Sequence, residues 1–389
     1  MNTNRWASAR VKAMPASVFD TMDRAKSRAK AKGLELIDLS IGSSDLAPPQ
    51  EALQALRDAT HLSETYGYCL FSGTKALRHA VSDWFERRYD LSVNPDEHVL
   101  SLIGSQEGFA NLLLATTDPG DLILAPDPGY PSYYGAIALA GLELATMPLL
   151  EENAYLPDLS RISEKVAKRA KVMVISYPNN PTAAVAPDAF MQEAVTFCHD
   201  HGILLIHDFP YVDMVFGEYR APSVLTQKGG METAIELYSC SKSFHMGGFR
   251  MGWAAGNAEA IAALAQAKGA IDFNQYVGIQ RAAVASLKAD ASATRAEVFE
   301  ARRDMLVATL NRVGWPTPLP QASMYVWTKL PRGLRDSFAF TLELAEATGV
   351  CLNPGRAFGE EGEGYVRFAL VREPDVLARA VERIQAFLD

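Results

Sequence analysis

The chain has little cysteine and no long hydrophobic run. Its four cysteines, Cys69, Cys198, Cys240 and Cys351, lie far apart among 389 residues and form no CxxC pair. This spacing argues against a zinc site and against the disulfide framework of a small secreted protein. No apolar stretch reaches the ~20 residues that a membrane-spanning helix needs. We therefore expect a cytoplasmic protein that folds without a metal.

The chain also has fewer basic residues than acidic ones. The sequence has 37 Lys and Arg against 46 Asp and Glu, a formal net charge of -9. Such a chain has no long-range attraction to nucleic acid or to anionic lipid, so we expect neither as a partner. The basic N-terminal stretch, residues 1–33, is similar to a transit peptide but lacks an apolar core. We expect it to form an amphipathic helix of the mature protein.

The middle of the chain indicates an α/β fold. Hydrophobic residues make up 48% of the sequence, and the length suggests roughly two to three domains. Between about residues 99 and 256, apolar runs alternate with helical patterns, which predicts a mainly parallel, doubly wound sheet with ligands at the carboxyl ends of its strands. A helix is expected between Pro187 and Gly202. The expected strands are VLSLIG, DLILAP, KVMVIS, GILLIHDF, AIELYSC and RMGWAAG.

The pattern changes after about residue 285. A long helical segment over 286–313 is followed by a strand (MYVWTKL), a helix over 335–348, two strands (VCLNP and YVRFAL) and a final helix. This order predicts a smaller α+β domain of residues 286–389, which the N-terminal segment 1–45 joins in space. Residues 46–285 would then form the large domain.

The strongest indication of chemistry is the segment SCSKSFHMGGFRMG at residues 239–252, just after an apolar strand. Lys242 in this position can form an imine with an aldehyde cofactor and can also serve as a base. Ser239, Ser241 and Arg250 offer two hydroxyls and a guanidinium, which suit a phosphate dianion. The alternative is a lysine at a strand edge in a Ser/Gly loop.

The segment ILLIHDFPY ends an apolar strand in Asp208 and places Tyr211 three residues later. A carboxylate at that edge can pair with a pyridine nitrogen and keep it protonated, so that the ring becomes an electron sink. Tyr211 could donate a hydrogen bond to a phenolic oxygen of the ring. Alternatively, Asp208 could be the N-cap of a helix.

Three further segments could complete a cofactor site. The turn YPNNPT, residues 177–182, can aim Asn180 at a ring oxygen and at a substrate carboxylate. LIGSQEG precedes a helix that opens near Gln106, so the amides of Ser105 and Gln106 would favour a phosphate. PDPGYPSYY offers the flat face of Tyr130 for stacking on a ring. Each segment taken alone could equally be structural.

The combination of these segments resembles class I/II aminotransferases of fold type I. Within that superfamily the chain is similar to LL-diaminopimelate aminotransferases, from MPASVFDTMDRAKSRAKAKGLELIDLSIGSSD through YGYCLFSGTKALRHAVSDWF to NPGRAFGEEGEGYVRFAL. The resemblance covers almost the whole chain. The residues that carry it, in order, are Gly104, Tyr130, Asn180, Asp208, Tyr211, Lys242, Arg250 and Arg367.

The resemblance implies pyridoxal 5'-phosphate as the cofactor, bound as an imine to Lys242, which then moves the proton of the substrate's Cα. Asp208 would pair with the pyridinium, Tyr211 and Asn180 with the ring oxygen, and Tyr130 would stack on the ring. Tyr68 would reach the phosphate from the second subunit of a homodimer. The other residues around the phosphate would be Ser105, Gln106, Ser239, Ser241 and Arg250.

For the substrate, the resemblance implies that Arg367 holds the α-carboxylate with a bidentate pair, with Gly42 and Asn180 beside it. The alternative for Arg367 is a surface arginine on a strand. Arg356 stands where many relatives have a small residue, and we expect it to meet a distal carboxylate of the substrate. The alternative is a loop arginine that pairs with Glu360 or Glu361.

Two other positions depart from the family pattern. The Asn-Pro-Thr-Gly turn of the family ends in Ala183 here, so either this position does not need a positive φ or the turn is slightly strained. The family's IGDPD type of segment is IGSSD at residues 41–45. Because this segment and Arg356 fall in stretches that line the substrate pocket, the choice of substrate is left open.

The expected activity is ping-pong transfer of an amino group between an amino acid, LL-diaminopimelate or another dicarboxylic one, and a 2-oxo acid. The alternative on the same fold is a β-lyase or decarboxylase, because the same imine can break other bonds at Cα. A non-catalytic cofactor sensor is disfavoured by the acidic chain and by a family match that begins within about 20 residues of the N-terminus.

Overall fold

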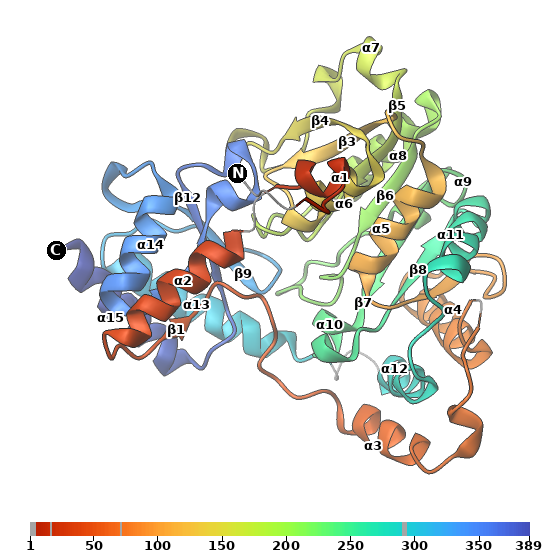
Figure 1. The fold of residues 1–389 in the computed structure, drawn as a ribbon, viewed down its shortest axis with the longest axis horizontal. Helices are drawn as coiled ribbons and strands as arrows, with labels where there is room; N and C mark the ends of the chain where they lie inside the picture. Colours follow the sequence, from red (N-terminus) through yellow and green to blue (C-terminus); the bar gives the residue numbers. More distant parts are fainter. Residues whose placement is uncertain (1–4, 16–17, 71, 290–293) are drawn as a thin grey trace.

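A seven-stranded sheet forms the centre of the computed structural model, which describes residues 5–15, 18–70, 72–289 and 294–389. The strand order is β2-β8-β7-β6-β5-β3-β4 (Figure 1). Among these strands, β8 runs antiparallel to its neighbours β2 and β7, and the other pairs are parallel, which confirms a mainly parallel sheet. The strands are β2 (Val99–Leu102), β3 (Leu122–Asp127), β4 (Glu143–Pro148), β5 (Ala170–Ile175), β6 (Leu204–Asp208), β7 (Ala234–Ser239) and β8 (Gly252–Gly256).

The six strands predicted in this region are all present, and one strand was missed. β4 pairs with β3 at the edge of the sheet, and most of its side chains are exposed or half-buried. An edge strand of this kind has no continuous apolar run, because its side chains do not have to enter a core. The pattern that revealed the central strands is therefore absent from residues 143–148.

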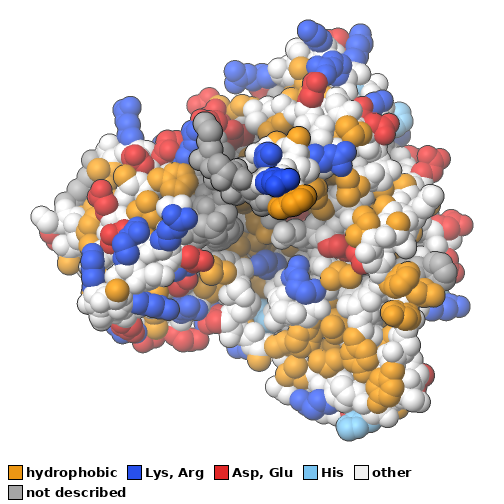
Figure 2. Space-filling view, viewed as in Figure 1, with side chains coloured by type: hydrophobic (Ala, Val, Ile, Leu, Met, Phe, Trp, Pro, Cys, Tyr) orange, Lys and Arg blue, Asp and Glu red, His pale blue; other side chains and the backbone are white. Residues whose placement is uncertain are grey.

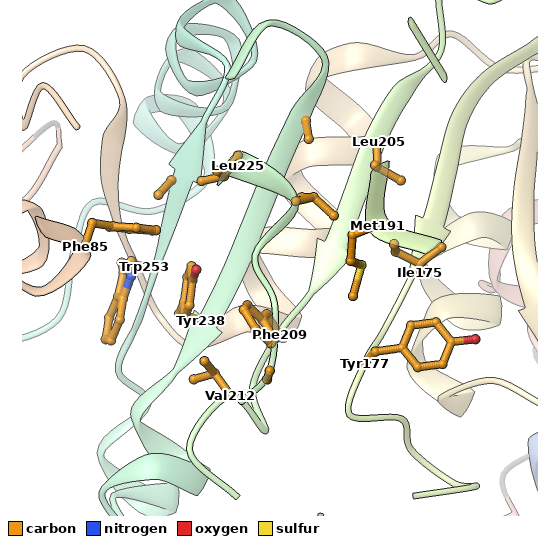
Figure 3. Close-up of a cluster of buried hydrophobic side chains, with 14 of the residues drawn as sticks. Phe85, Ile175, Tyr177, Met191, Leu205, Phe209, Val212, Leu225, Tyr238 and Trp253 are labelled. Carbon is orange, nitrogen blue, oxygen red and sulfur yellow. The ribbon is translucent and has the colours of Figure 1, made fainter. Parts of the chain in front are cut away.

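Helices cover both faces of the sheet, because successive side chains of each strand point to opposite faces. On β5, Met173 and Ile175 join one hydrophobic cluster, whereas Val172 and Val174 join the other. Part of the first cluster is drawn in Figure 3, where Tyr238 stacks on Trp253 with ring centroids 5.2 Å apart. The helices that contribute to the first cluster include α4 (Lys75–Tyr89), α8 (Asp188–His201) and α12 (Val277–Ala289), and those of the second are α5 (Ser105–Thr116), α6 (Pro131–Ala140) and α11 (Ala258–Ile271).

The predicted helix between Pro187 and Gly202 is confirmed as α8, with Gly202 in the left-handed conformation just past its end. Two other elements of this part matter below. Helix α3 (Gln50–Ala59) packs on α12. The short α10 (Cys240–Ser243) follows β7 directly. Two further short helices are α7 (Glu164–Ala167) and α9 (Gly230–Thr233).

Two smaller sheets and four helices build the second part of the molecule, on the left in Figure 1. β1 (Ile37–Asp38) pairs in parallel with β10 (Val350–Cys351), and an antiparallel sheet has the order β11-β12-β9. VCLNP was predicted as one strand, which is wrong, because its halves β10 and β11 pair in different sheets. The remaining elements are β9 (Tyr325–Lys329), β11 (Asn353–Pro354), β12 (Tyr365–Ala369), α2 (Val18–Ala31), α13 (Ala296–Arg312), α14 (Ser337–Thr348) and α15 (Pro374–Leu388).

One helix prediction was also wrong, and another was confirmed in part. The segment 286–313 was predicted as one helix but belongs to two, since α12 ends at Ala289 and α13 begins at Ala296 after Arg295 with φ 51°. Residues 290–293 of that prediction lie outside the described part of the chain. The N-terminal stretch forms the short α1 (Ala9–Ala13), which packs on α6, as well as α2, which packs on α14. Domain boundaries at residues 45 and 285 stay a prediction.

Candidate active site

Five strands of the large sheet end at one edge and bring the predicted site residues together. β2, β3, β5, β6 and β7 all point the same way, because the single reversed strand is β8. Carboxyl ends of parallel strands form the usual ligand crevice of an open α/β sheet. Among the described residues, no cluster of His, Cys, Asp or Glu at this edge or elsewhere could hold a metal ion.

Lys242 lies on the one-turn helix α10, directly after β7. The hydroxyl of Ser239 caps this turn by accepting a hydrogen bond from the backbone N–H of Ser241, 3.2 Å away. The half-buried Lys242 donates from Nζ to the carbonyl oxygen of Gly42 and lies 5.9 Å from the ring centroid of Tyr211. The N-terminal segment thus closes over the lysine, which is not a solvent-exposed side chain at a strand edge.

Asp208 is a buried carboxylate with one free oxygen. Its side chain ends β6, is 7% exposed, and accepts a 2.5 Å hydrogen bond from the hydroxyl of Tyr133 at Oδ2. A turn follows, so Asp208 is not a helix N-cap. The other oxygen, Oδ1, is buried and accepts no hydrogen bond from the described residues. Such an atom requires a donor, and the protonated nitrogen of a pyridine ring is a suitable one.

Burial raises the pKa of Asp208 to about 6, although the hydrogen bond from Tyr133 and the charges of His207 and Lys242 act in the opposite direction. An aspartate in this state binds a cation-forming group strongly, because pairing removes the cost of its desolvated charge. The burial and the raised pKa of Asp208 therefore agree with the role that the sequence resemblance implies, which is pairing with a pyridine nitrogen.

Two tyrosines face each other beside the lysine. The hydroxyls of Tyr211 and Tyr325 are 2.9 Å apart in a buried hydrogen bond. Burial raises the pKa of Tyr211, whereas the cations Lys242 and Arg367 lower the pKa of Tyr325 even though burial opposes its ionisation. A Cβ on Gly42 would lie 1.9 Å from the hydroxyl of Tyr325, so this position accepts only glycine. Gly42 thus belongs to the site in two ways. Its carbonyl oxygen accepts from Lys242, and the absence of a side chain leaves room for the hydroxyl of Tyr325.

Arg367 is a buried cation on β12, 4% exposed, and is therefore not a surface arginine. Its guanidinium donates to Oδ1 of Asn180 at 2.6 Å and to the carbonyl oxygen of Ser40 at 2.9 Å. It also lies over the rings of Tyr325 and Phe358, at 4.0 and 4.7 Å from their centroids. None of the ion pairs between described residues includes Arg367, and its Nε is buried without an acceptor. A carboxylate ligand would satisfy this guanidinium.

A corner whose groups suit an anion forms where α5 begins. Gly104, with φ 82°, precedes Ser105, the first residue of the 12-residue helix, so the first amides of α5 are free to bind an anion. The Arg250 guanidinium donates to Ser241 Oγ at 3.4 Å and would lie 2.5 Å from a Cβ on Gly104. Glycine is needed here both for φ and for this close approach.

Tyr130 and Gln106 complete this corner. The Tyr130 hydroxyl donates to Oε1 of Gln106 at 3.2 Å, and its ring is half-buried at the start of α6. Tyr133, three residues later and inside α6, donates its hydroxyl hydrogen to Asp208. Sequence analysis noted Tyr130 and missed Tyr133, although residues three apart on a helix share a face.

The turn that carries Asn180 keeps its left-handed residue. Ala183 is buried with φ 58°, so the substitution of glycine has left the backbone conformation in place at a cost of roughly 1–2 kcal/mol. Asn179 stabilises the turn, because its Oδ1 accepts from the backbone N–H and the hydroxyl of Thr182 at 3.1 and 2.8 Å. The sequence left open whether Ala183 needs a positive φ, and the structure shows that it does, so the turn is slightly strained.

Two predicted residues do not join this cluster within the single chain. Tyr68 is 86% exposed and contacts Phe273, with ring centroids 5.7 Å apart. Arg356 forms a bidentate ion pair with Glu360, which is the contact expected of a loop arginine that does not bind substrate. Four residues that the sequence analysis missed do belong to the cluster, namely Ser40, Tyr133, Tyr325 and Phe358.

Fold and site together define an α/β enzyme with a lysine at the carboxyl edge of its main sheet. A family model for class I and II aminotransferases matches residues 35–384. The chain therefore belongs to the class I and II aminotransferase family. It is an enzyme that transfers amino groups between amino acids and 2-oxo acids. Among the described residues, no helix has both the length and the apolar character of a membrane span.

Within this family the chain is similar to LL-diaminopimelate aminotransferases. It is 40% identical over 381 residues to the one from Desulforudis audaxviator, with 97% of each chain covered. It is 41% identical over 379 residues to LL-diaminopimelate aminotransferase 2 from Trichormus variabilis, again with 97% of each covered. A solved structure of a probable N-succinyldiaminopimelate aminotransferase from Thermus thermophilus superposes with a TM-score of 0.91 at 46% identity, covering 95% of this chain and all of the other.

Proposed function

We propose that the enzyme uses pyridoxal 5'-phosphate, bound to Lys242, to transaminate an amino acid with a distal carboxylate, of which LL-diaminopimelate is the leading candidate. The observation that supports this most is the buried, unsatisfied oxygen Oδ1 of Asp208 at the sheet edge that also carries Lys242. Pyridoxal phosphate, when bound, supplies an electron sink for the negative charge that develops at the substrate's Cα.

The residues of the chain fit each part of this cofactor. Asp208 would pair with the ring nitrogen, and Tyr211 and Asn180 would lie toward the ring oxygen. Tyr130 would stack on the ring. The free amides of α5 would bind the phosphate at its helix terminus. The remaining phosphate ligands would be Ser105, Gln106, Ser239, Ser241 and Arg250, with Tyr68 from a second subunit.

Lys242 and Arg367 would act directly on the substrate. The free amine of Lys242 would take the proton from the substrate's Cα and hold it until the proton is returned two atoms away, as the 1,3-shift of transamination requires. Arg367 and Asn180, already joined by a 2.6 Å hydrogen bond, would hold the α-carboxylate and so fix the orientation of the Cα–H bond. The reaction would follow a ping-pong course, with the 2-oxo acid of the donor leaving before the acceptor binds.

Substrate choice rests on the relatives and on Arg356. The relatives carry the names of aminotransferases for LL-diaminopimelate and N-succinyldiaminopimelate. Arg356 lies on the segment Gly355–Phe358, whose Phe358 packs against Arg367. Its ion pair with Glu360 is partly exposed, and an exposed pair of this kind contributes about 0–1 kcal/mol, so a substrate carboxylate can replace Glu360 at little cost.

We predict different substrate profiles for variants of the two arginines. Arg367→Ala should lower kcat/KM for every amino acid tested against 2-oxoglutarate, by roughly ten- to more than a hundred-fold, because a charged hydrogen-bond pair is worth about 1.5–3 kcal/mol. Arg356→Ala should slow LL-diaminopimelate, glutamate and aspartate but not alanine. If Arg356→Ala slows dicarboxylic substrates and alanine equally, or slows neither, Arg356 is a loop residue that only pairs with Glu360.

We also propose that the enzyme acts as a homodimer. Tyr68 contacts Phe273, and both are exposed, as are Tyr66, Leu70 and Ile271 in the same two segments of the chain. Hydrophobic side chains gather over α3 and α12 on the face shown in Figure 2, next to this part of the chain. Exposed apolar side chains that gather in one place are typical of an interface. A second subunit there would bring Tyr68 to the neighbour's site.

Hybrid dimers test this arrangement. Subunits with Tyr68→Ala and subunits with Lys242→Ala should both be impaired alone. After denaturation and refolding of an equal mixture, half of the dimers are hybrids, and each hybrid contains one intact site if Tyr68 acts across the interface. The mixture should then recover about a quarter of the wild-type activity. Activity no higher than the average of the two parents would show that Tyr68 serves its own chain or none.

A further inference from the structure

A segment of the smaller part of the molecule, residues 355–362, lies against the large sheet. It follows β11 directly and forms two short 3-10 turns, Gly355–Phe358 and Glu360–Gly362. The residue that meets it is Asp127, which ends β3 and is 5% exposed. Asp127 has no part in the site described above. A carboxylate buried at such a junction needs hydrogen-bond donors to offset the loss of water.

The donors to Asp127 are two backbone amides of this segment. Oδ2 accepts from the N–H of Glu360 at 3.2 Å, and Oδ1 accepts from the N–H of Glu361 at 3.1 Å. Both amides are at the start of the second turn, where the first N–H groups have no partner within the turn itself. A Cβ on Gly359, just before this turn, would lie 2.0 Å from Oδ1 of Asp127. The segment thus packs directly on the carboxylate.

The same segment is held at a second point, the carbonyl oxygen of Phe358. This oxygen accepts from the backbone N–H of Gly129 at 2.7 Å and lies 2.9 Å from the hydroxyl of Tyr134. Gly129 immediately precedes Tyr130, and Tyr134 belongs to α6. The end of β3 and the start of α6 therefore bind residues 358–361 through both carbonyl and amide groups.

Phe358 connects this contact with the arginine proposed to bind substrate. Its side chain is 2% exposed, and the guanidinium of Arg367 lies over its ring, 4.7 Å from the centroid. Such a contact between a cation and an aromatic ring is attractive and depends on where the ring stands. Arg367 lies on β12 of the smaller part, whereas Lys242 and Asp208 lie on the large part. The placement of Arg367 relative to them therefore depends on how the two parts are joined.

We propose that Asp127 is a positioning residue for substrate binding. Its carboxylate fixes residues 358–361 on the large part. The ring of Phe358 then holds the guanidinium of Arg367 in place. This inference rests on the proposed role of Arg367 in binding the α-carboxylate. Asp127 acts only through the segment, so its loss should weaken the binding of substrate more than it slows the reaction of bound substrate.

Hydrogen–deuterium exchange of the holoenzyme tests the docking of the segment. Asp127→Ala removes both acceptors, so the amides of Glu360 and Glu361 should exchange about tenfold faster than in wild type. Asp121→Ala is the matched control. Asp121 directly precedes β3, at the opposite end of the strand, and accepts from the backbone N–H of Asp118 at 2.8 Å. Its loss should leave the exchange of the two amides unchanged.

Single turnovers with alanine and with glutamate test the effect on the substrate. Asp127→Ala should raise the apparent Kd of both by about tenfold, because an arginine that has become mobile must be ordered again when the carboxylate binds. The limiting rate should change by less than about threefold, because the bound carboxylate still meets Arg367 and Asn180. Both amino acids should respond alike, since each has an α-carboxylate. Asp121→Ala should again match wild type.

Arg367→Ala is measured in parallel, and thermal melting shows whether each variant is folded. If Asp127→Ala leaves exchange unchanged, or speeds it without weakening either substrate, the positioning role is overturned while the proposed function stands. If only glutamate is weakened, the segment acts through Arg356 and the proposal is wrong. If Arg367→Ala itself leaves the binding of both substrates unchanged, the proposed carboxylate site fails and the role of Asp127 fails with it. Should Asp127→Ala not fold, Asp127→Asn, which keeps one acceptor oxygen, decides by the same measurements.

Discussion

Replacing Lys242 with alanine is expected to leave a folded protein that has lost at least about 10²–10⁴-fold in the rate of transamination, because the group that carries the Cα proton is gone. The buried surroundings of α10 do not depend on the ammonium, whose hydrogen bond goes to the carbonyl of Gly42. Single-turnover rates with LL-diaminopimelate, together with a thermal melt, measure both parts of this prediction.

Covalent trapping provides the direct check on Lys242. Borohydride reduction of the wild-type holoenzyme followed by peptide mass spectrometry should locate the cofactor on Lys242, and Lys242→Ala should give no adduct. Lys228→Ala, which removes an exposed lysine, is the matched control and should behave as wild type. A cofactor adduct on any other lysine of the wild-type protein would overturn the assignment.

The second large effect is expected for Asp208→Asn. This variant retains an acceptor for the hydroxyl of Tyr133 but has no negative charge for the ring nitrogen. We expect the rate of Cα deprotonation to fall by about 10²–10³-fold, the loss usually seen when one electrostatic stabiliser of a developing charge is removed. Stopped-flow single turnovers report this step. Equal rates in variant and wild type would refute the role of Asp208.

The stability of the apoenzyme should also depend on the charge of Asp208. The folded-state pKa of about 6 lies above the ordinary value of 3.8 for an aspartate. The protonated carboxyl of Asp208 therefore contributes to the free energy of unfolding in full below about pH 3.8. This contribution is lost as the pH rises through 6, by about 3 kcal/mol in total. Urea unfolding should accordingly show that Asp208→Asn stabilises the apoenzyme at pH 7 relative to wild type and much less at pH 4.5.

Local patterns were enough to predict the central strands and the positions of Asp208 and Lys242. Each buried strand consists mostly of apolar residues; Asp208 is the last residue of β6, and Lys242 lies three residues after the end of β7. The edge strand β4 was missed because an exposed edge has no apolar run, and the start of α13 was missed because Arg295 before it has a left-handed backbone conformation. Neither feature is encoded by a periodic pattern.

Contacts between distant segments could not be predicted in the same way. Arg367 meets Asn180, 187 positions earlier, and Tyr325 meets Tyr211 across 114 positions. Which side chains become neighbours depends on the order of the strands and on the register of each pair. These are decided by how the whole chain packs rather than by the residues next to each side chain.

The sequence by itself determined the fold class, the family and the residues at the strand ends, because strands, turns and helix starts are specified by neighbouring residues. Only the tertiary structure decided that Asp208 has an unsatisfied oxygen, that Arg367 is buried without a carboxylate partner, and that Arg356 is paired with Glu360. It also joined Asp127 to the backbone amides of Glu360 and Glu361. The physical reason is that burial and hydrogen bonding are properties of a three-dimensional neighbourhood, which residues far apart in the chain create together.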